Sequence, residues 1–403
     1  MWSYFVILLF VLVLSVEYDI LDRTRHKILF YRIILTISIL LSGFRFRVGL
    51  DTVQYLELFY SSIPKIEELS YDNLFSSYME PLFLMMMSIV KSLFGRFYFV
   101  QLLQAIIVNA LIFKYIRKHS SYIFFCVFLY FVWKYFTYNM EEMRASIALV
   151  ICLYANDYII EKKVIKGMLL FLISLLFHYS AALLLLTPII LIINKRLDFR
   201  GWLIIMVAMI ICIGYRSILG ELMVLLSFNE VLLMKLSYYS TESGLMEQKL
   251  NLNGILFVFF QYILIILVSA RTIVENNRKF INLEPFLFIG VLFVVISIPI
   301  SLFYRYVNFY IIYFVLFYSE FLIENIKKYK KTHVIRYVSK SLILFFPYFL
   351  TIFLTYSAKV DKTQYCTMDR YIPYTTVFNR TFELNRERLL NYYMNTSYKE
   401  NEY

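Results

Sequence analysis

The sequence has few charged side chains and few helix-breaking residues. Asp, Glu, Lys and Arg make up 17% of the 403 residues, apolar types make up 61%, and there are only 10 glycines and 7 prolines. Apolar runs close to the roughly 20 residues that cross a bilayer recur along the chain. This excludes a soluble domain. The sequence predicts an all-α polytopic integral membrane protein of about 11 to 12 transmembrane helices, with room for re-entrant segments.

Residues that bind metals or attack substrates are also scarce. The four cysteines form no C-x-x-C pair, and His178 has no second histidine or cysteine at metal-ligand spacing. We therefore expect no metal and no cofactor. The sequence also lacks G-x-S-x-G, P-loop and G-x-G-x-x-G patterns, which excludes serine hydrolases and nucleotide-driven pumps.

Negative charge is the scarcer sign, and the formal net charge is +12. In a soluble protein this excess would suggest nucleic-acid binding. Here most Lys and Arg residues occupy short loops between apolar runs, where the positive-inside rule accounts for them. We expect a lipid bilayer as partner and no nucleic acid.

The apolar runs define a membrane domain over residues 1–356. It contains two long connections, 44–78 and 220–251, and a polar tail follows at 357–403. The runs lie at about 2–16, 28–43, 79–94, 97–116, 121–138, 144–160, 167–193, 201–219, 252–270, 284–303, 306–325 and 338–356.

Simple alternation of spans cannot place every basic loop in the cytoplasm. The conflict disappears if one run between 79 and 116, and also the run 167–193, enter and leave on the same side. His178 interrupts the second run, so a re-entrant hairpin and a single tilted helix both remain open. With the hairpin, the long connections and the tail all face outward.

Three polar strings interrupt the apolar chain, and ionisable groups near bilayer depth usually have a function. In the first string, Arg45 and Arg47 flank Phe46. Asp51 and Tyr55 follow Arg47 at helical spacing. One hypothesis is a diphosphate clamp beside an acid/base carboxylate, because a guanidinium presents a planar fork to phosphate oxygens. The alternative is a local Arg47/Asp51 pair with Arg45 snorkelling.

Arg144 begins a predicted helix directly after an acidic pair. An intrahelical pair with Glu141 is one interpretation. Against it, a positive charge opposes the dipole at a helix start, and the small Ala145 and Ser146 would let a ligand approach. Arg305, at an outward corner, is a further candidate cation, and snorkelling is the alternative.

Glu80 and His178 are the remaining candidates. Glu80 precedes Pro81 at the start of an apolar run. One interpretation is structural, because a carboxylate there complements the positive end of a helix, and the alternative is a catalytic role. His178 lies inside an apolar run beside the hydroxyls of Tyr179 and Ser180. It is either a structural histidine or a base.

The order of these motifs resembles the EpsG/Wzy-type bacterial polysaccharide polymerases. The resemblance covers roughly residues 40 to 190, and extends weakly through Arg305 and residues 371–374. Ala145 and Leu50 depart from the family pattern, which weakens the assignment of contacts around Arg144. The residues that carry it are Arg47, Gly49, Asp51, Thr52, Tyr55, Glu80, Pro81, Arg144, Ile147, Ala148 and 177–181.

The resemblance implies a multi-pass glycosyltransferase of the bacterial inner membrane with its site on the outer side. It would polymerise undecaprenyl-diphosphate-linked repeat units into O-antigen, capsule or exopolysaccharide, beside a flippase and a chain-length regulator. Implied roles are diphosphate binding for Arg45, Arg47, Arg144 and Arg305, catalysis for Asp51, His178 and Glu80, and support from Tyr55, Tyr179 and Ser180.

Two other functions remain open at this stage. A lipid-linked oligosaccharide flippase would also want a cationic cavity, but transporters usually show related halves, and no duplication is visible here. A membrane O-acyltransferase would explain a lone intramembrane histidine but not the arginines.

The predicted topology can be tested by cysteine labelling. Cysteines introduced at Ser61, Ser243 and Thr396 should react with a membrane-impermeant thiol reagent from outside, and those at Ser120 and Lys330 should not. Labelling at Lys330 with none at Ser243 would invert the topology and put the candidate site on the cytoplasmic face.

Overall fold

The computed structural model describes the chain in two compact units. One is Met1–Leu185 with Ile352–Tyr403, and the other is Leu186–Thr351. The regular secondary structure of the described residues is helical, with two isolated backbone bridges as the only strand-like pairing among them, which confirms the all-α class. They are 2–71, 74, 79–188, 201, 203–205, 207–208, 259–263, 278–298, 303–329, 346, 349–350, 352–359 and 365–395.

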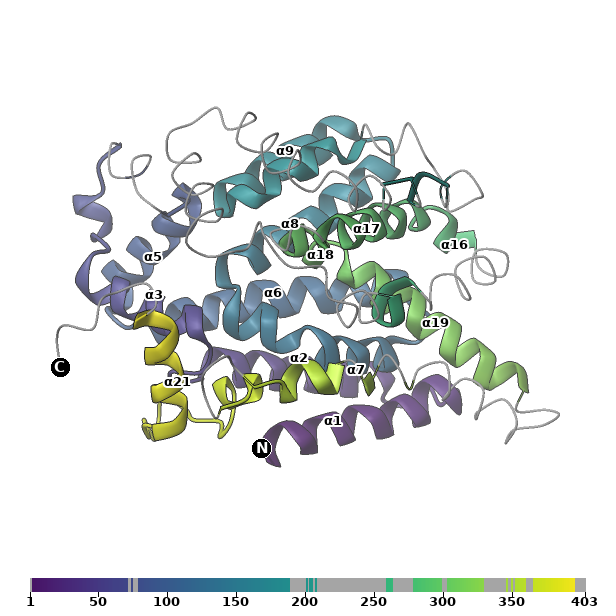
Figure 1. The fold of residues 1–403 in the computed structure, drawn as a ribbon, viewed down its shortest axis with the longest axis horizontal. Helices are drawn as coiled ribbons and strands as arrows, with labels where there is room; N and C mark the ends of the chain where they lie inside the picture. Colours follow the sequence, from purple (N-terminus) through teal and green to yellow (C-terminus); the bar gives the residue numbers. More distant parts are fainter. Residues whose placement is uncertain are drawn as a thin grey trace. The chain divides into compact units, whose positions relative to one another are not determined.

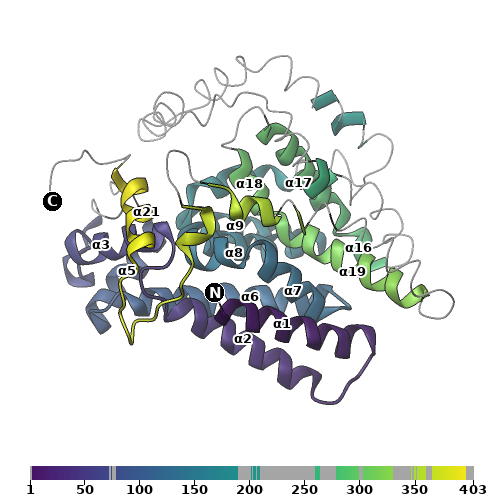
Figure 2. The ribbon, with the colours of Figure 1, turned by 60° about the horizontal axis from the view of Figure 1, so that its bottom comes forward.

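Helices of the first unit pack in antiparallel pairs. Helix α2 packs along α6, α1 along α7 and α8 along α9 (Figures 1 and 2). Their bounds are α1 Trp2–Ser15, α2 Lys27–Gly43, α3 Leu50–Ser61, α5 Pro81–Phe94, α6 Tyr98–His119, α7 Ile123–Trp133, α8 Met143–Ile160, α9 Val164–Phe177 and α21 Leu384–Asn395.

The described part of the second unit is a smaller helical cluster. Helix α17 packs against α18 and α19, and the Phe286 ring stacks on Tyr313 with centroids 4.8 Å apart. The bounds are α16 Arg278–Ile281, α17 Glu284–Ser297, α18 Tyr304–Asn308 and α19 Ile311–Tyr329.

Most predicted runs in the first unit coincide with helices to within a few residues. Among the described helices, α6 and α8 are long and apolar enough to cross a membrane, and α5, α7, α9 and α17 are shorter apolar helices. The multi-pass topology therefore stays a prediction. The runs 201–219, 252–270 and 338–356 and the connection 220–251 lie largely or wholly outside the described residues.

The run 167–193 is broken at His178. Helix α9 ends at Phe177, His178 is extended (φ −159°, ψ 121°), and a 3-10 helix follows at Tyr179–Leu186. A single tilted helix over this run is therefore wrong. The break turns the chain so that the Tyr179 N–H donates to a carboxylate oxygen of Glu80, 3.3 Å away.

Residues 365–395, expected as part of a polar tail, belong to the first unit. Figure 1 shows this segment in yellow, and we refer to it as the C-terminal segment. The Phe46 N–H donates to Thr375 O at 2.9 Å. Buried Arg386 donates to Pro373 O and Thr375 Oγ1. The polar residues of this segment therefore form buried hydrogen bonds as well as a solvated surface.

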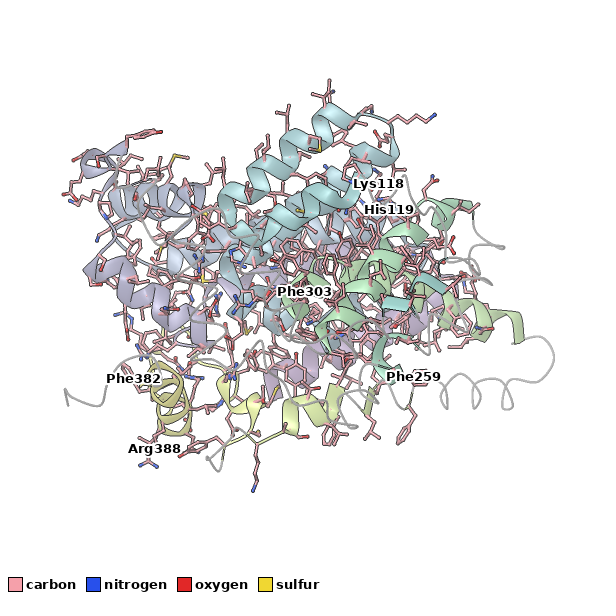
Figure 3. All side chains as sticks on the ribbon, turned by 45° about the horizontal axis from the view of Figure 1, so that its top comes forward. Lys118, His119, Phe259, Phe303, Phe382 and Arg388 are labelled. Atoms are coloured by element: carbon pink, nitrogen blue, oxygen red, sulfur yellow. The ribbon has the colours of Figure 1, made fainter. Side chains whose placement is uncertain are left out.

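A charged cluster lies where α6 and α8 end. The Asp157 carboxylate accepts from Lys118 Nζ at 2.7 Å and lies 3.0 Å from His119 Nε2. Lys118 and His119 are neighbours at the end of α6 (Figure 3). Asp157 is thirteen positions after Arg144 on α8, which separates the two by about 20 Å along the helix axis.

Polar side chains also pair inside the helix bundle. Asn109 Nδ2 donates to Asn139 Oδ1 at 2.6 Å, and Gln104 Nε2 donates to Ser146 Oγ at 3.0 Å. These bonds tie α6 to the π-helical turn η3, Thr137–Glu141, and to the first turn of α8. The entry into α8 is fixed in this way.

Gly49 is the glycine whose replacement should damage the fold. Its φ is +91°, and a Cβ there would lie 1.9 Å from Met140 O. We expect Gly49→Ala to lower the yield of folded protein strongly, because backbone strain adds to an atomic overlap. Thermal unfolding of detergent-purified protein measures this.

Gly95→Ala is the matched control, since φ there is +61° and the nearest atom to a Cβ is Lys91 O at 4.0 Å. This variant should cost only the strain of a left-handed residue, about 1–2 kcal/mol. Equal loss in both variants would contradict a close approach at Gly49.

Candidate functional site

The centre of the candidate site is the Glu80 carboxylate. Glu80 directly precedes Pro81, the first residue of α5, yet its side chain does not cap that helix. Its Oε1 lies 2.9 Å from His178 Nδ1, and its Oε2 accepts a hydrogen bond from Arg144 Nη1. The side chain is 2% exposed. Glu80 therefore joins two candidate residues that come from distant parts of the chain.

Arg144 is held from two directions. Besides Glu80, its Nε donates to the Tyr55 hydroxyl, and its guanidinium carbon lies 5.3 Å from the centre of the Tyr55 ring. The alternative partner, Glu141, instead accepts the Leu50 N–H at 3.0 Å. The intrahelical interpretation of Arg144 is therefore wrong, because its guanidinium is hydrogen-bonded by Tyr55 on α3 and by Glu80, which precedes α5.

His178 is oriented by the same carboxylate. In the neutral tautomer in which Nδ1 carries the proton, Nδ1–H donates to Glu80 and Nε2 is the basic nitrogen. The Ser180 Oγ is buried and has no hydrogen-bond partner among the described residues, while Tyr179 is 37% exposed. This carboxylate–imidazole pair is an arrangement that enzymes use to position a general base.

Asp51 lies one turn before Tyr55 on α3 and is half-buried. Burial raises the pKa of the Tyr55 phenol, Arg144 opposes that effect, and the negative charges of Asp51 and Glu80 reinforce it. Tyr55 therefore stays a neutral hydroxyl. Asp51 is close enough for its charge to act on both Tyr55 and Arg144.

Arg45 is inside the protein. Its side chain donates to Thr52 Oγ1, at 2.8 Å from Nη2, and to the backbone oxygen of Ser42. Burial lowers the pKa of Arg45 to about 10, against weaker opposing contributions from tyrosines and Glu141. In this geometry Arg45 ties the end of α2 to α3, and its predicted contact with a diphosphate stays a prediction.

Arg47 has a different partner from the one expected. It precedes α3 with φ +51°, so it does not share a helix face with Asp51 and Tyr55. Its Nε and Nη2 donate to the two carboxylate oxygens of Glu387 at 2.8 and 2.7 Å. The local Arg47/Asp51 pair is therefore wrong, because Gly49 turns the chain before α3 begins.

Arg305 is exposed on α18, in the second unit. Its role in diphosphate binding, like the roles of all the candidate residues, stays a prediction.

Sequence reasoning missed Glu387 and Arg370 as partners of the candidate segments, and it named Thr52 as a motif residue without assigning it a contact. Glu387 holds Arg47, Thr52 holds Arg45, and Arg370 faces Glu141 at 3.7 Å. Glu387 and Arg370 lie in the expected tail, where composition alone predicts solvation. The aromatic string that follows Arg370 is the one sequence signal that could have drawn attention to this region.

Residues 28–376 match the family described as the EpsG family. No curated protein and no solved structure matches.

The Glu80 cluster should contribute strongly to stability. Glu80→Gln removes the negative charge that compensates Arg144 and weakens the hydrogen bond that orients His178, and breaking a buried ion pair costs about 3 kcal/mol. We therefore expect a clear drop in the thermal stability of the purified protein. Glu57→Gln, on the exposed side of α3, should change stability by about 0.5 kcal/mol or less. Equal effects of the two substitutions would contradict the central position of Glu80.

Proposed function

Because the chain belongs to the EpsG family, a family of Wzy-type polysaccharide polymerases, we propose that it is an integral membrane glycosyltransferase that joins lipid-linked oligosaccharide repeat units. Its donor is a glycan on undecaprenyl diphosphate in the bacterial inner membrane. Its product is O-antigen, capsule or exopolysaccharide. The observation that supports this proposal best is the Glu80 carboxylate between Arg144 and His178.

The reaction requires a fixed cation and a base, and the cluster around Glu80 contains both. The acceptor hydroxyl oxygen forms a bond to the anomeric carbon of the donor, and the bond from that carbon to the diphosphate breaks. Negative charge then develops on the leaving diphosphate, where a fixed cation stabilises it. The hydroxyl proton passes to a base.

Arg144 is the cation best placed for the diphosphate. A guanidinium has five N–H donors, and Tyr55 and Glu80 together take two of them. The side chain is 16% exposed, so it is partly open to a ligand. Its planar fork is held in one orientation before substrate binds, which is the condition for electrostatic stabilisation of a transition state.

His178 is our choice for the base, with Asp51 as the alternative. Both carboxylate oxygens of Glu80 are already bonded, one to His178 and one to Arg144. The role of Glu80 is to orient the imidazole so that Nε2 receives the proton. Tyr55 supports Arg144, and Tyr179 and Ser180 follow the base on the same break in the chain.

The position of the cluster fits a site that opens away from the cytoplasm. Arg144 is at the start of α8, whereas Asp157 with Lys118 and His119 is near its end. Lys118 belongs to a basic cluster at the end of α6 that the positive-inside rule places in the cytoplasm. The other end of α8, with the candidate site, then faces the outer leaflet.

The proposal is tested with purified protein and its lipid-linked repeat unit. We expect a ladder of products that differ by one repeat unit, formed without ATP or nucleotide sugar, because the diphosphate bond carries the driving force. Gel electrophoresis of the products measures it. Protein that moves the lipid-linked unit across a bilayer but never lengthens it would support a flippase instead.

Two arginine variants serve as controls in this assay. Arg144→Lys keeps the charge but cannot reach Tyr55, Glu80 and a phosphate with one planar group, so the ladder should weaken at least about tenfold. Arg96→Lys, on an exposed arginine just before α6, should leave it unchanged. A fully active Arg144→Lys would remove Arg144 from the diphosphate site.

A further inference from the structure

Three distant segments meet at the carboxylate of Glu141. Glu141 ends η3, and its Oε2 accepts the Leu50 N–H at 3.0 Å. Its Oε1 lies 3.7 Å from Nη1 of Arg370, in the C-terminal segment. The two side chains are only 12% and 19% exposed. We refer to this meeting point as the Glu141 junction.

Backbone contacts close the Glu141 junction on the other sides. The Gly49 N–H donates to Arg370 O at 3.3 Å, and the Thr52 hydroxyl donates to Met140 O at 2.9 Å. Tyr371, which follows Arg370, is buried. Its backbone oxygen accepts a hydrogen bond from the Tyr4 hydroxyl of α1 at 3.0 Å. This hydrogen bond links the residue after Arg370 to the first helix of the unit.

The Glu141 junction lies at the start of both helices that carry the candidate site. Leu50 is the first residue of α3, so fixing its N–H fixes Asp51, the next residue, and Tyr55 one turn later. On the other side, Glu141 is three residues before Arg144, and α8 begins at Met143. A displacement at Glu141 would therefore shift Asp51, Tyr55 and Arg144 relative to one another.

The interaction between Glu141 and Arg370 depends on charge. Oε1 of Glu141 is buried, and at 3.7 Å from Nη1 of Arg370 it interacts with that guanidinium by electrostatic attraction and not by a hydrogen bond. Glutamine at 141 would still accept the Leu50 N–H through its amide oxygen. It would lose the attraction to Arg370.

We propose that Glu141 and Arg370 are positioning residues for the catalytic site, and that the C-terminal segment contributes to the geometry of that site through Arg370. This inference rests on the proposed polymerase function. Neither residue touches the reacting atoms. Their ion pair holds the starts of α3 and α8 in the register at which Asp51, Tyr55 and Arg144 meet.

The test measures kcat and KM for ladder formation per folded molecule, with folded protein quantified by size-exclusion chromatography. Glu141→Gln and Arg370→Gln should each lower kcat on the order of 10-fold or more, because small misplacements of reacting groups are costly. KM should change little. The melting temperature should fall, because each substitution breaks a largely buried ion pair, and for this reason kcat is taken per folded molecule. Arg370→Lys keeps the charge and should restore most of the lost kcat.

The control is Arg388→Gln, which removes an equal charge from the exposed surface of α21 (Figure 3). It should keep the wild-type kcat. The double variant Glu141→Gln/Arg370→Gln should lose no more than the worse single variant, because both changes break the same interaction.

Three outcomes would overturn the inference. Normal kcat in both single variants, with Arg144→Lys still impaired, would refute the positioning role and leave the polymerase proposal standing. Losses that multiply in the double variant would show that the two residues act separately. Absence of a ladder with the wild-type protein would refute the polymerase proposal itself, and the inference with it.

Discussion

A carboxylate buried among helices requires positive partners, and the arrangement of the candidate site follows from how Glu80 is satisfied. Its side chain is 2% exposed, and its two oxygens bond Arg144 and His178, which are 64 and 98 residues away in sequence. To reach it, α9 has to end at Phe177 and the backbone at His178 becomes extended. One buried charge thus explains the break in a long apolar run and brings a cation and an imidazole together.

Arg45, Arg386 and Arg144 of the first unit differ in their partners. Arg45 and Arg386 donate to backbone oxygens and to the hydroxyls of Thr52 and Thr375. Burial lowers the pKa of Arg386, as it does that of Arg45, and nearby acidic groups oppose that effect at Arg386. These two hold the framework together. Arg144 bonds a carboxylate and a phenol and keeps donors in reserve, which suits a residue that binds an anion.

The proposed reaction needs little more from the protein than fixed geometry. A diphosphate is already a good leaving group, so a positioned cation and a positioned base account for most of the assistance that a glycosyl transfer requires. Many long-range contacts in the first unit fix that geometry. The Glu141 junction, the Asn109 to Asn139 bond and the docked C-terminal segment all converge on the starts of α3 and α8.

The sequence by itself determined the helical class and most helix bounds in the first unit, whereas it left a break at His178 and a single tilted helix both open, and the structure decided for the break. The class and the bounds follow from local apolar runs and from polar residues inside them, which are readable within a window of about 20 residues. It also singled out Glu80, Arg144 and His178, because isolated ionisable residues stand out in an apolar chain. The resemblance that their order carries is confirmed by the family match.

Only the tertiary structure decided which residues form ion pairs and hydrogen bonds with each other. Arg144 pairs with Glu80 and Tyr55 instead of Glu141, Arg47 pairs with Glu387 instead of Asp51, and the expected tail packs into the first unit. Local spacing offered each arginine an acidic neighbour three or four residues away. Sequence spacing reveals only partners within one helical turn. A buried charge instead pairs with the group that the packing of distant helices brings within about 3 Å of it.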